Sequence, residues 1–246
     1  MEKIVTCATV TKAVATLSRQ CNLYLPEDVC IRIRQALETE KNALAKTILQ
    51  DILENHAIAA KTGLPLCQDT GTAVVFVELG QDVRIQEGYL YDAIQAGISQ
   101  GYTEHLLRAS IMEHPWLRKN TGDNTPGIIH LQLIPGDEIR ITLMPKGGGA
   151  ENYAAVAMLT PAQGLEGAKE FVLDCIKRAG PNACPPLVVG VGIGGNFETA
   201  PLLSKKALLR PVDQHNPLPE VRVLEEELLE KINHLNIGPL GFGRCV

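Results

Sequence analysis

Hydrophobic positions recur at helical spacing through the first part of the chain. In residues 10–17, 29–37 and 43–60, apolar side chains return every three or four positions, which places them on one side of a helix. Pro26 precedes the second of these segments and is typical of a helix start. The pattern therefore predicts three helices, which we interpret as a helical N-terminal subregion covering about residues 1–60.

Beyond this subregion, short apolar runs alternate with further helical periodicity. The apolar runs predict strands at residues 73–79, 127–134, 138–144 and 187–191. Pro135-Gly136-Asp137 separates the second and third runs and favours a hairpin between them. The periodic segments predict helices at residues 87–112, from about Glu151, at 164–178, at 198–209 and at 218–235. Strands mixed with helices indicate a single α/β unit.

Composition narrows the classes of function. The chain has 246 residues, a formal net charge of −5 and 4% aromatic residues, so it lacks the basic surface and the stacking platform typical of nucleic-acid binding. The longest uncharged stretch, residues 179–197, is broken by prolines and glycines and does not predict a membrane span. Residues 1–4 show no apolar signal segment, so we expect a cytoplasmic location.

Three glycine-rich loops follow or precede predicted elements, at residues 61–71, 146–149 and 190–195. Each is explained by a tight turn, but three in one chain favour backbone N–H groups that share an anionic ligand. The third loop formally satisfies the G-x-G-x-x-G pattern of dinucleotide folds. We reject that reading, because the second parallel strand and its terminal acidic residue are missing.

The first of these loops carries the most reactive tripeptide, Cys67-Gln68-Asp69. A thiolate can bind metal, an amide can orient a substrate and a carboxylate can move a proton. Cys184 is held among prolines in another loop. Seven cysteines without a CxxC pair leave both metal binding and inert packing open. Arg108, taken alone, is interpreted as a solvated side chain.

Six segments of the chain carry a resemblance to one known family. They read KTGLPLCQDTGTAVVFVELGQDV, LRAS, KNTGDNTPGIIH, MPKGGGAENYAAVAMLTPAQG, CPPLVVGVGIGGNFETAPLLSKKALLR and LNIGPLG. In this order, from about residue 10 to 241, the chain resembles the alpha part of iron–sulfur (class I) fumarate hydratases and the related L-tartrate dehydratases. The resemblance implies an α/β fold in which the helical N-terminal subregion packs on a mixed sheet with flanking helices.

The chemistry that the resemblance implies is that of a hydro-lyase built around a [4Fe-4S] cluster. Three cysteines hold such a cluster, and one iron keeps an open position for substrate oxygens. Cys67 and Cys184 match two of the three metal ligands. The residues that match the family's substrate site are Gln68, Asp69, Arg108, Gly147, Gly148 and Gly149. Among them, Asp69 is the candidate catalytic proton donor to the departing hydroxyl, and Arg108 pairs with a substrate carboxylate.

The family's third cluster cysteine lies beyond the LNIGPLG segment. Cys245 comes too early for that position and is only a weak candidate for the third ligand. We therefore expect residues 1–246 to form one iron–sulfur hydro-lyase domain of the alpha type that is shortened at its C-terminus. The resemblance further implies a beta subunit that supplies the catalytic base, a small dicarboxylate substrate and an oligomer.

Three functions remain open at this stage. The first is the alpha subunit of a fumarate hydratase, which hydrates fumarate to malate with a separate beta subunit. The second is the alpha subunit of an L-tartrate dehydratase, with the same cluster and one more substrate hydroxyl. The third is a non-catalytic, shortened remnant that lacks the third cluster ligand.

Overall fold

The computed structural model describes residues 3–244 and divides the chain into two compact units. The first unit comprises Met1–Leu25 and His56–Gly148, and the second comprises Pro26–Asn55 and Gly149–Val246. The division falls inside helix α3 (Ala43–Thr62). The three helices expected in the N-terminal part are present, and they contribute to both units. The single functional domain that the sequence suggests stays a prediction.

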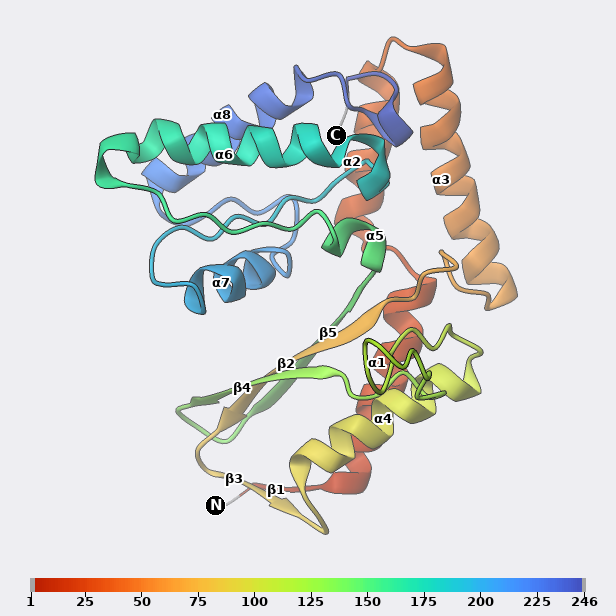
Figure 1. Ribbon diagram of the computed structural model, residues 1–246. Helices are drawn as coiled ribbons and strands as arrows, with labels where there is room; N and C mark the ends of the chain where they lie inside the picture. Colours follow the sequence, from red (N-terminus) through yellow and green to blue (C-terminus); the bar gives the residue numbers. More distant parts are fainter. Residues whose placement is uncertain (1–2, 245–246) are drawn as a thin grey trace. The chain divides into compact units, whose positions relative to one another are not determined.

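The first unit is built on a mixed sheet. Its further elements are β1 (Lys3–Thr6), α1 (Cys7–Leu23), β2 (Thr72–Gly80), β3 (Val83–Gln86), α4 (Leu90–Glu104), β4 (Ile128–Ile134) and β5 (Ile139–Lys146). β2 lies between β4 and β5, parallel to β4 and antiparallel to β5 (Figure 1). β1 and β3, which the sequence pattern did not predict, pair in parallel as a separate ribbon. The expected mixed sheet with flanking helices is confirmed.

The hairpin expected around residues 135–137 is wrong, because β2 separates the two strands that it was to join. The connecting turn instead crosses the end of β2 at Gly80, whose N–H donates to the carbonyl of Glu138 at 2.7 Å. A Cβ at Gly80 would collide with the carbonyl of Gly136 and lie 2.8 Å from the nitrogen of Glu138. The glycine therefore permits the crossing that places β4 and β5 on opposite sides of β2.

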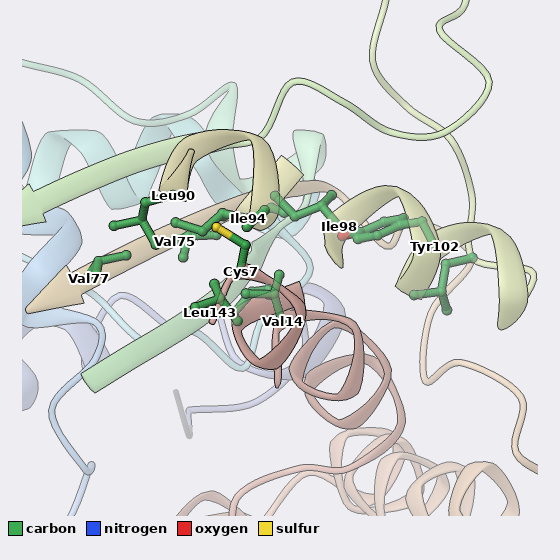
Figure 2. Packing of buried hydrophobic residues seen from close by; sticks show 13 residues of the cluster. Cys7, Val14, Val75, Val77, Leu90, Ile94, Ile98, Tyr102 and Leu143 are labelled. Atoms are coloured by element: carbon green, nitrogen blue, oxygen red, sulfur yellow. The ribbon is translucent and has the colours of Figure 1, made fainter. Parts of the chain in front are cut away.

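Helices α1 and α4 cover one face of this sheet. Their apolar side chains meet those of β2 and β5, as Figure 2 shows for Val14, Ile94, Val75 and Leu143. The two helices approach closely, since a Cβ at Gly97 of α4 would lie 2.6 Å from the carbonyl oxygen of Thr11. This closely packed sheet and helix pair carries the loops at the ends of its strands.

The helix expected over residues 87–112 is shorter than predicted. α4 ends at Glu104, and Leu106 takes a left-handed backbone with φ of 53°. The N–H of Leu107 donates to the carbonyl of Tyr102 at 2.9 Å, which closes the end of the helix. Residues 105–112 therefore leave the helix as a loop, and this loop carries Arg108.

The second unit is largely helical. Its elements are α2 (Glu27–Thr39), α5 (Gly148–Glu151), η1 (Pro161–Gln163), α6 (Gly164–Ala179), η2 (Gly180–Ala183), α7 (Thr199–Ala207), α8 (Pro219–Asn233) and η3 (Pro239–Gly241). α6 and α8 lie side by side (Figure 1) and share an apolar core. The helix expected from about Glu151 is instead the single turn α5, which ends at that residue.

The strand expected at residues 187–191 is also wrong, since no strand forms there in the described part of the chain. Leu187 and Val191 are apolar because they pack against the core of α6 and α8. Gly190 and Gly192 lie so close to α7 that a Cβ at either position would collide with its backbone. The apolar run at residues 187–191 therefore reflects packing against helices, and it was mistaken for the pattern of a buried strand. Within residues 3–244, no helix combines the length and apolar character needed to cross a membrane.

Candidate functional site

The loop between α3 and β2 presents Cys67 to solvent. The N–H of Leu66 donates to the carbonyl of Asn22 at 2.8 Å, which ties the loop to the end of α1. The Cys67 sulfur is exposed and accepts the N–H of Asp69 at 3.4 Å, while its thiol lies 3.5 Å from Oε1 of Gln68. The Cys67 sulfur is therefore accessible from solvent on a loop whose backbone is tied down, as a cysteine that binds a metal must be.

Asp69 joins two of the glycine-rich loops. Its Oδ1 accepts the N–H of Gly71 at 3.1 Å, and its Oδ2 accepts the N–H of Gly148 at 2.8 Å. The sequence analysis expected the Gly147–Gly149 segment to offer its N–H groups to a substrate anion. In this structure a carboxylate of the chain takes the Gly148 donor.

Gly71 explains why these loops can lie against each other. Its φ is +63°, and a Cβ would collide with the Lys146 carbonyl group and lie 2.6 Å from the nitrogen of Gly147. Only glycine fits both the left-handed backbone and the close approach. The loops at 61–71 and 146–148 thus form one feature of the first unit, whereas the loop at 190–195 belongs to the second unit.

Arg108 lies on the loop that follows α4 and is exposed. Its carbonyl accepts the hydroxyl of Thr70 at 3.1 Å, so its backbone is anchored next to the Asp69 loop. The first unit therefore brings together the backbones that carry Cys67, Gln68, Asp69 and Arg108 with Gly147 and Gly148. An exposed guanidinium above such an anchored backbone is suited to bind a carboxylate.

Cys184 lies in the second unit, at the end of η2. It is exposed and takes a left-handed backbone with φ of 56° and ψ of 57°. The N–H of Leu240 donates to the carbonyl of Pro185 at 2.9 Å, which secures the loop to the segment around η3. Gly149 lies near the same loop, because a Cβ there would stand 3.7 Å from the carbonyl oxygen of Asn182. Gly149 therefore lies next to the loop that carries Cys184 within this unit.

The described cysteines are all free, and they differ in exposure. Cys67 and Cys184 are exposed, whereas Cys7 and Cys30 are buried. Burial raises the pKa of the Cys21 thiol to about 12, so this group stays protonated near neutral pH. Among the described cysteines, Cys67 and Cys184 are therefore the ones most accessible to solvent or to a cofactor.

A protein metal site needs several donor side chains close together. No three or more His, Cys, Asp or Glu side chains gather closely enough to hold a metal ion within residues 3–244. Cys245, the weak candidate for a third ligand, lies outside the described residues. The donor chemistry nevertheless suits iron, because thiolates are the ligands that iron–sulfur clusters take.

Comparison with known proteins places the chain in a family. The sequence pattern of the fumarate hydratase (fumerase) family matches residues 11–245. The chain belongs to this family. A relative from Methanocaldococcus jannaschii, provisionally named as an L(+)-tartrate dehydratase subunit alpha, is 42% identical over 240 residues, covering 95% of this chain and 84% of the relative. The L(+)-tartrate dehydratase subunit alpha of Escherichia coli strain UTI89 is 33% identical over 235 residues, covering 94% of this chain and 77% of the relative.

Membership of the fumarate hydratase family confirms the resemblance drawn from the sequence and makes the chain a hydro-lyase family member. Sequence reasoning nevertheless missed the buried polar residues beneath the Asp69 loop, namely Thr70, Tyr102 and Asn124. The available signal was that Thr70 and Asn124 stand within two of the resembling segments, KTGLPLCQDTGTAVVFVELGQDV and KNTGDNTPGIIH. Nothing in these segments indicates which backbone groups the two side chains meet.

Proposed function

We propose that the chain is the alpha subunit of an iron–sulfur hydro-lyase that reversibly hydrates fumarate to malate with a separate beta subunit. The observation that carries this proposal is the Asp69 carboxylate, held by the N–H groups of Gly71 and Gly148 beside the exposed Cys67. This part of the first unit thus combines a thiol that can bind metal, a carboxylate that can transfer a proton and backbone N–H groups that can bind an anion. Binding and dehydrating a small hydroxy diacid requires these groups.

The proposed cofactor is a [4Fe-4S] cluster with Cys67 and Cys184 among its ligands. Both thiols are exposed in loops whose backbones are anchored, which suits ligation of a preformed cluster. When bound, such a cluster supplies a Lewis-acidic iron that polarises substrate oxygens. We place the enzyme in the cytoplasm, because free cysteines are typical of a reducing compartment.

The chain's own residues bind the diacid and move one proton. Arg108 pairs its guanidinium with one substrate carboxylate, and Gln68 orients the substrate by its side-chain amide. A second carboxylate takes the N–H groups of Gly147–Gly149, including the Gly148 donor that Asp69 holds in the free chain. Once released from that donor, Asp69 in its protonated form delivers the proton on Oδ2 to the departing hydroxyl, which leaves as water, and the carboxylate then takes up a new proton from solvent. The catalytic base that removes the C–H proton is assigned to the beta subunit.

A second candidate is an L(+)-tartrate dehydratase alpha subunit. The observation that favours it is the shared name of the two relatives from M. jannaschii and E. coli. Tartrate carries one more hydroxyl than malate, and the same residues would bind both of its carboxylates. Turnover of the enzyme assembled with its beta subunit, measured separately with malate and with L(+)-tartrate, separates the two candidates.

The cluster proposal is tested by iron and acid-labile sulfide per chain after anaerobic reconstitution. We expect Cys67→Ser and Cys184→Ser each to lose the bound iron, whereas Cys175→Ser, a partly exposed cysteine of α6, keeps it. Iron that survives either of the first two substitutions would refute the ligand assignment. A wild-type chain that binds no iron would favour the non-catalytic alternative.

A further inference from the structure

A buried hydrogen-bond network joins the Asp69 loop to the Arg108 loop in the first unit. Thr70, Tyr102 and Asn124 are exposed by 2% or less. The Tyr102 hydroxyl donates to the carbonyl of Thr70 at 2.8 Å, and the Thr70 hydroxyl donates to the carbonyl of Arg108 at 3.1 Å. Buried polar groups that are satisfied in this way hold their backbones in one arrangement.

Asn124 makes the most direct connection in this network. Its Nδ2 donates to the carbonyl of Gly71 at 2.9 Å, and its Oδ1 accepts the N–H of Ser110 at 2.7 Å. Gly71 stands two residues after Asp69, and Ser110 stands two residues after Arg108. One side-chain amide therefore spans the two loops at equivalent distances from their functional residues.

Both the backbone conformation and the hydrogen bonds at position 124 favour asparagine. The backbone takes a φ of +62°, a conformation that asparagine tolerates better than most residues with a side chain. The side chain must donate to a carbonyl and accept from an N–H at the same time, which an amide does and a carboxylate does not. Because the partners are backbone groups of fixed polarity, they also determine which end of the amide is oxygen.

We propose that Asn124 is a positioning residue that sets the Arg108 loop against the Asp69 loop, so that the two bind one diacid as a unit. This inference rests on the proposed function, which assigns the diacid to these residues. Asn124 does not touch the substrate, since its side chain is fully buried. It acts through Gly71 and Ser110, and its loss separates the two binding groups without removing either.

Two substitutions at this position test the bridge. Asn124→Asp keeps the acceptor for Ser110 but loses the donor to Gly71, whereas Asn124→Gly keeps the left-handed backbone and loses the whole bridge. Gln95→Glu is the matched control. The Gln95 amide makes the same kind of bridge, to the carbonyl of Gly127 at 3.1 Å and from its N–H at 2.8 Å, but contacts neither loop.

The first measurement is hydrogen exchange of the full-length chain alone. We expect both Asn124 variants to raise exchange about tenfold in segments 66–73 and 105–111 together, as the loss of one buried bridge implies. Gln95→Glu should raise exchange only around residues 95 and 127. A rise in one of the two segments alone, or an equal rise with Gln95→Glu, would overturn the inference.

The second measurement is steady-state kinetics of the enzyme assembled with its cluster and beta subunit. We expect both Asn124 variants to raise the KM for the diacid about tenfold, with a smaller change in kcat and unchanged iron content. Gln95→Glu should leave KM within about twofold. An unchanged KM in the Asn124 variants would refute the positioning role. If the wild-type enzyme converts neither malate nor tartrate, the proposed function fails, while the exchange measurement still decides whether Asn124 couples the loops.

Discussion

Oδ2 of Asp69 accepts the N–H of Gly148 at 2.8 Å, across 79 positions of the chain. This bond makes one residue both the link between two glycine-rich loops and the candidate proton donor. Because the Gly148 N–H is also a proposed substrate donor, the Asp69 carboxylate occupies in the free chain a position suited to a substrate carboxylate. Under the proposed function, we expect substrate binding to be coupled to the release of Asp69 from Gly148.

Asp69→Asn is expected to lower kcat by about two to four decades, as the loss of a general acid does. Asparagine still accepts the Gly71 N–H through its Oδ1. Its Nδ2 group, however, cannot accept the Gly148 N–H and has no acidic proton to give to the departing hydroxyl. Iron content should not change, because Asp69 is not among the proposed ligands. Stopped assays of malate dehydration together with iron analysis check both points, and near-unchanged turnover would remove the role from Asp69.

Gly71→Ala is expected to destabilise the chain by about 3 kcal/mol or more, because the added Cβ meets the backbone of Lys146 and Gly147. Gly63→Ala is the matched control. Gly63 also has a positive φ, of +73°, but a Cβ there meets nothing within 4 Å. Its cost should be about 1 kcal/mol from backbone conformation alone. Urea unfolding of both variants measures the difference, and equal costs would contradict the close approach of the loops.

Lys169 gives the second unit a dependence on pH. Its side chain is 10% exposed and bonds Glu166 and Glu227, each at 2.7 Å. Hydrogen bonds to Glu166 and Glu227 raise the pKa of Lys169, and hydrogen bonds from Lys169 and Lys231 lower the pKa of Glu227. The Lys169 contribution to stability is complete below its unfolded pKa and is lost as pH rises through the higher folded value. The Glu227 contribution is present above its unfolded pKa and is lost as pH falls through the lower folded value.

Lys169→Met should therefore flatten the alkaline limb of a plot of Tm against pH and weaken the acidic limb, where Lys231 still pairs with Glu227. Lys177→Met is the control, because Lys177 pairs with Asp174 at an exposed position of the same helix. Thermal unfolding from pH 3 to 11 gives both curves. The interpretation is wrong if the two variants follow the same pH dependence.

Glu40→Gln is expected to loosen the Cys184 loop. The buried Glu40 carboxylate accepts the N–H of Arg244 at 2.8 Å and that of Asn42 at 2.8 Å. The N–H of Leu240, in the same C-terminal segment, donates to the carbonyl of Pro185, which is next to Cys184. Loss of the Arg244 bond should therefore also loosen the backbone at Cys184. Oε1 of Glu40 also accepts the N–H of Lys41 at 2.7 Å, so glutamine keeps its oxygen at that position and turns its NH₂ group toward the Arg244 N–H, which breaks the Arg244 bond.

The rate at which a thiol reagent modifies each cysteine measures this loosening. In Glu40→Gln the rate at Cys184 should rise several-fold, while the rate at Cys67, in the other unit, should not change. Glu38→Gln, an exposed position of α2, should alter neither rate. If Cys184 reacts at the same rate in the variant and in the wild type, the C-terminal segment does not hold its loop.

The sequence by itself determined most of the long helices and the candidate chemistry. Helical periodicity predicted α1, α2, α6 and α8. This works because the buried side of a helix is formed by apolar residues that recur every three or four positions within the helix itself. The same reasoning identified the Cys67-Gln68-Asp69 loop, since glycine and proline mark turns wherever the rest of the chain lies. These are local properties, and the structure confirms that the segments take these forms.

The tertiary structure alone decided which segments meet. Every strand offers the same backbone donors and acceptors, so apolar patterning predicted β4 and β5 but could not show that β2 lies between them. The bond from Gly148 to Asp69 and the bridge from Asn124 to Gly71 and Ser110 likewise join positions that are distant in sequence. Side-chain amides and carboxylates find partners only after folding has brought backbone groups within hydrogen-bond distance, and this is why the sequence named Asp69 but not Asn124.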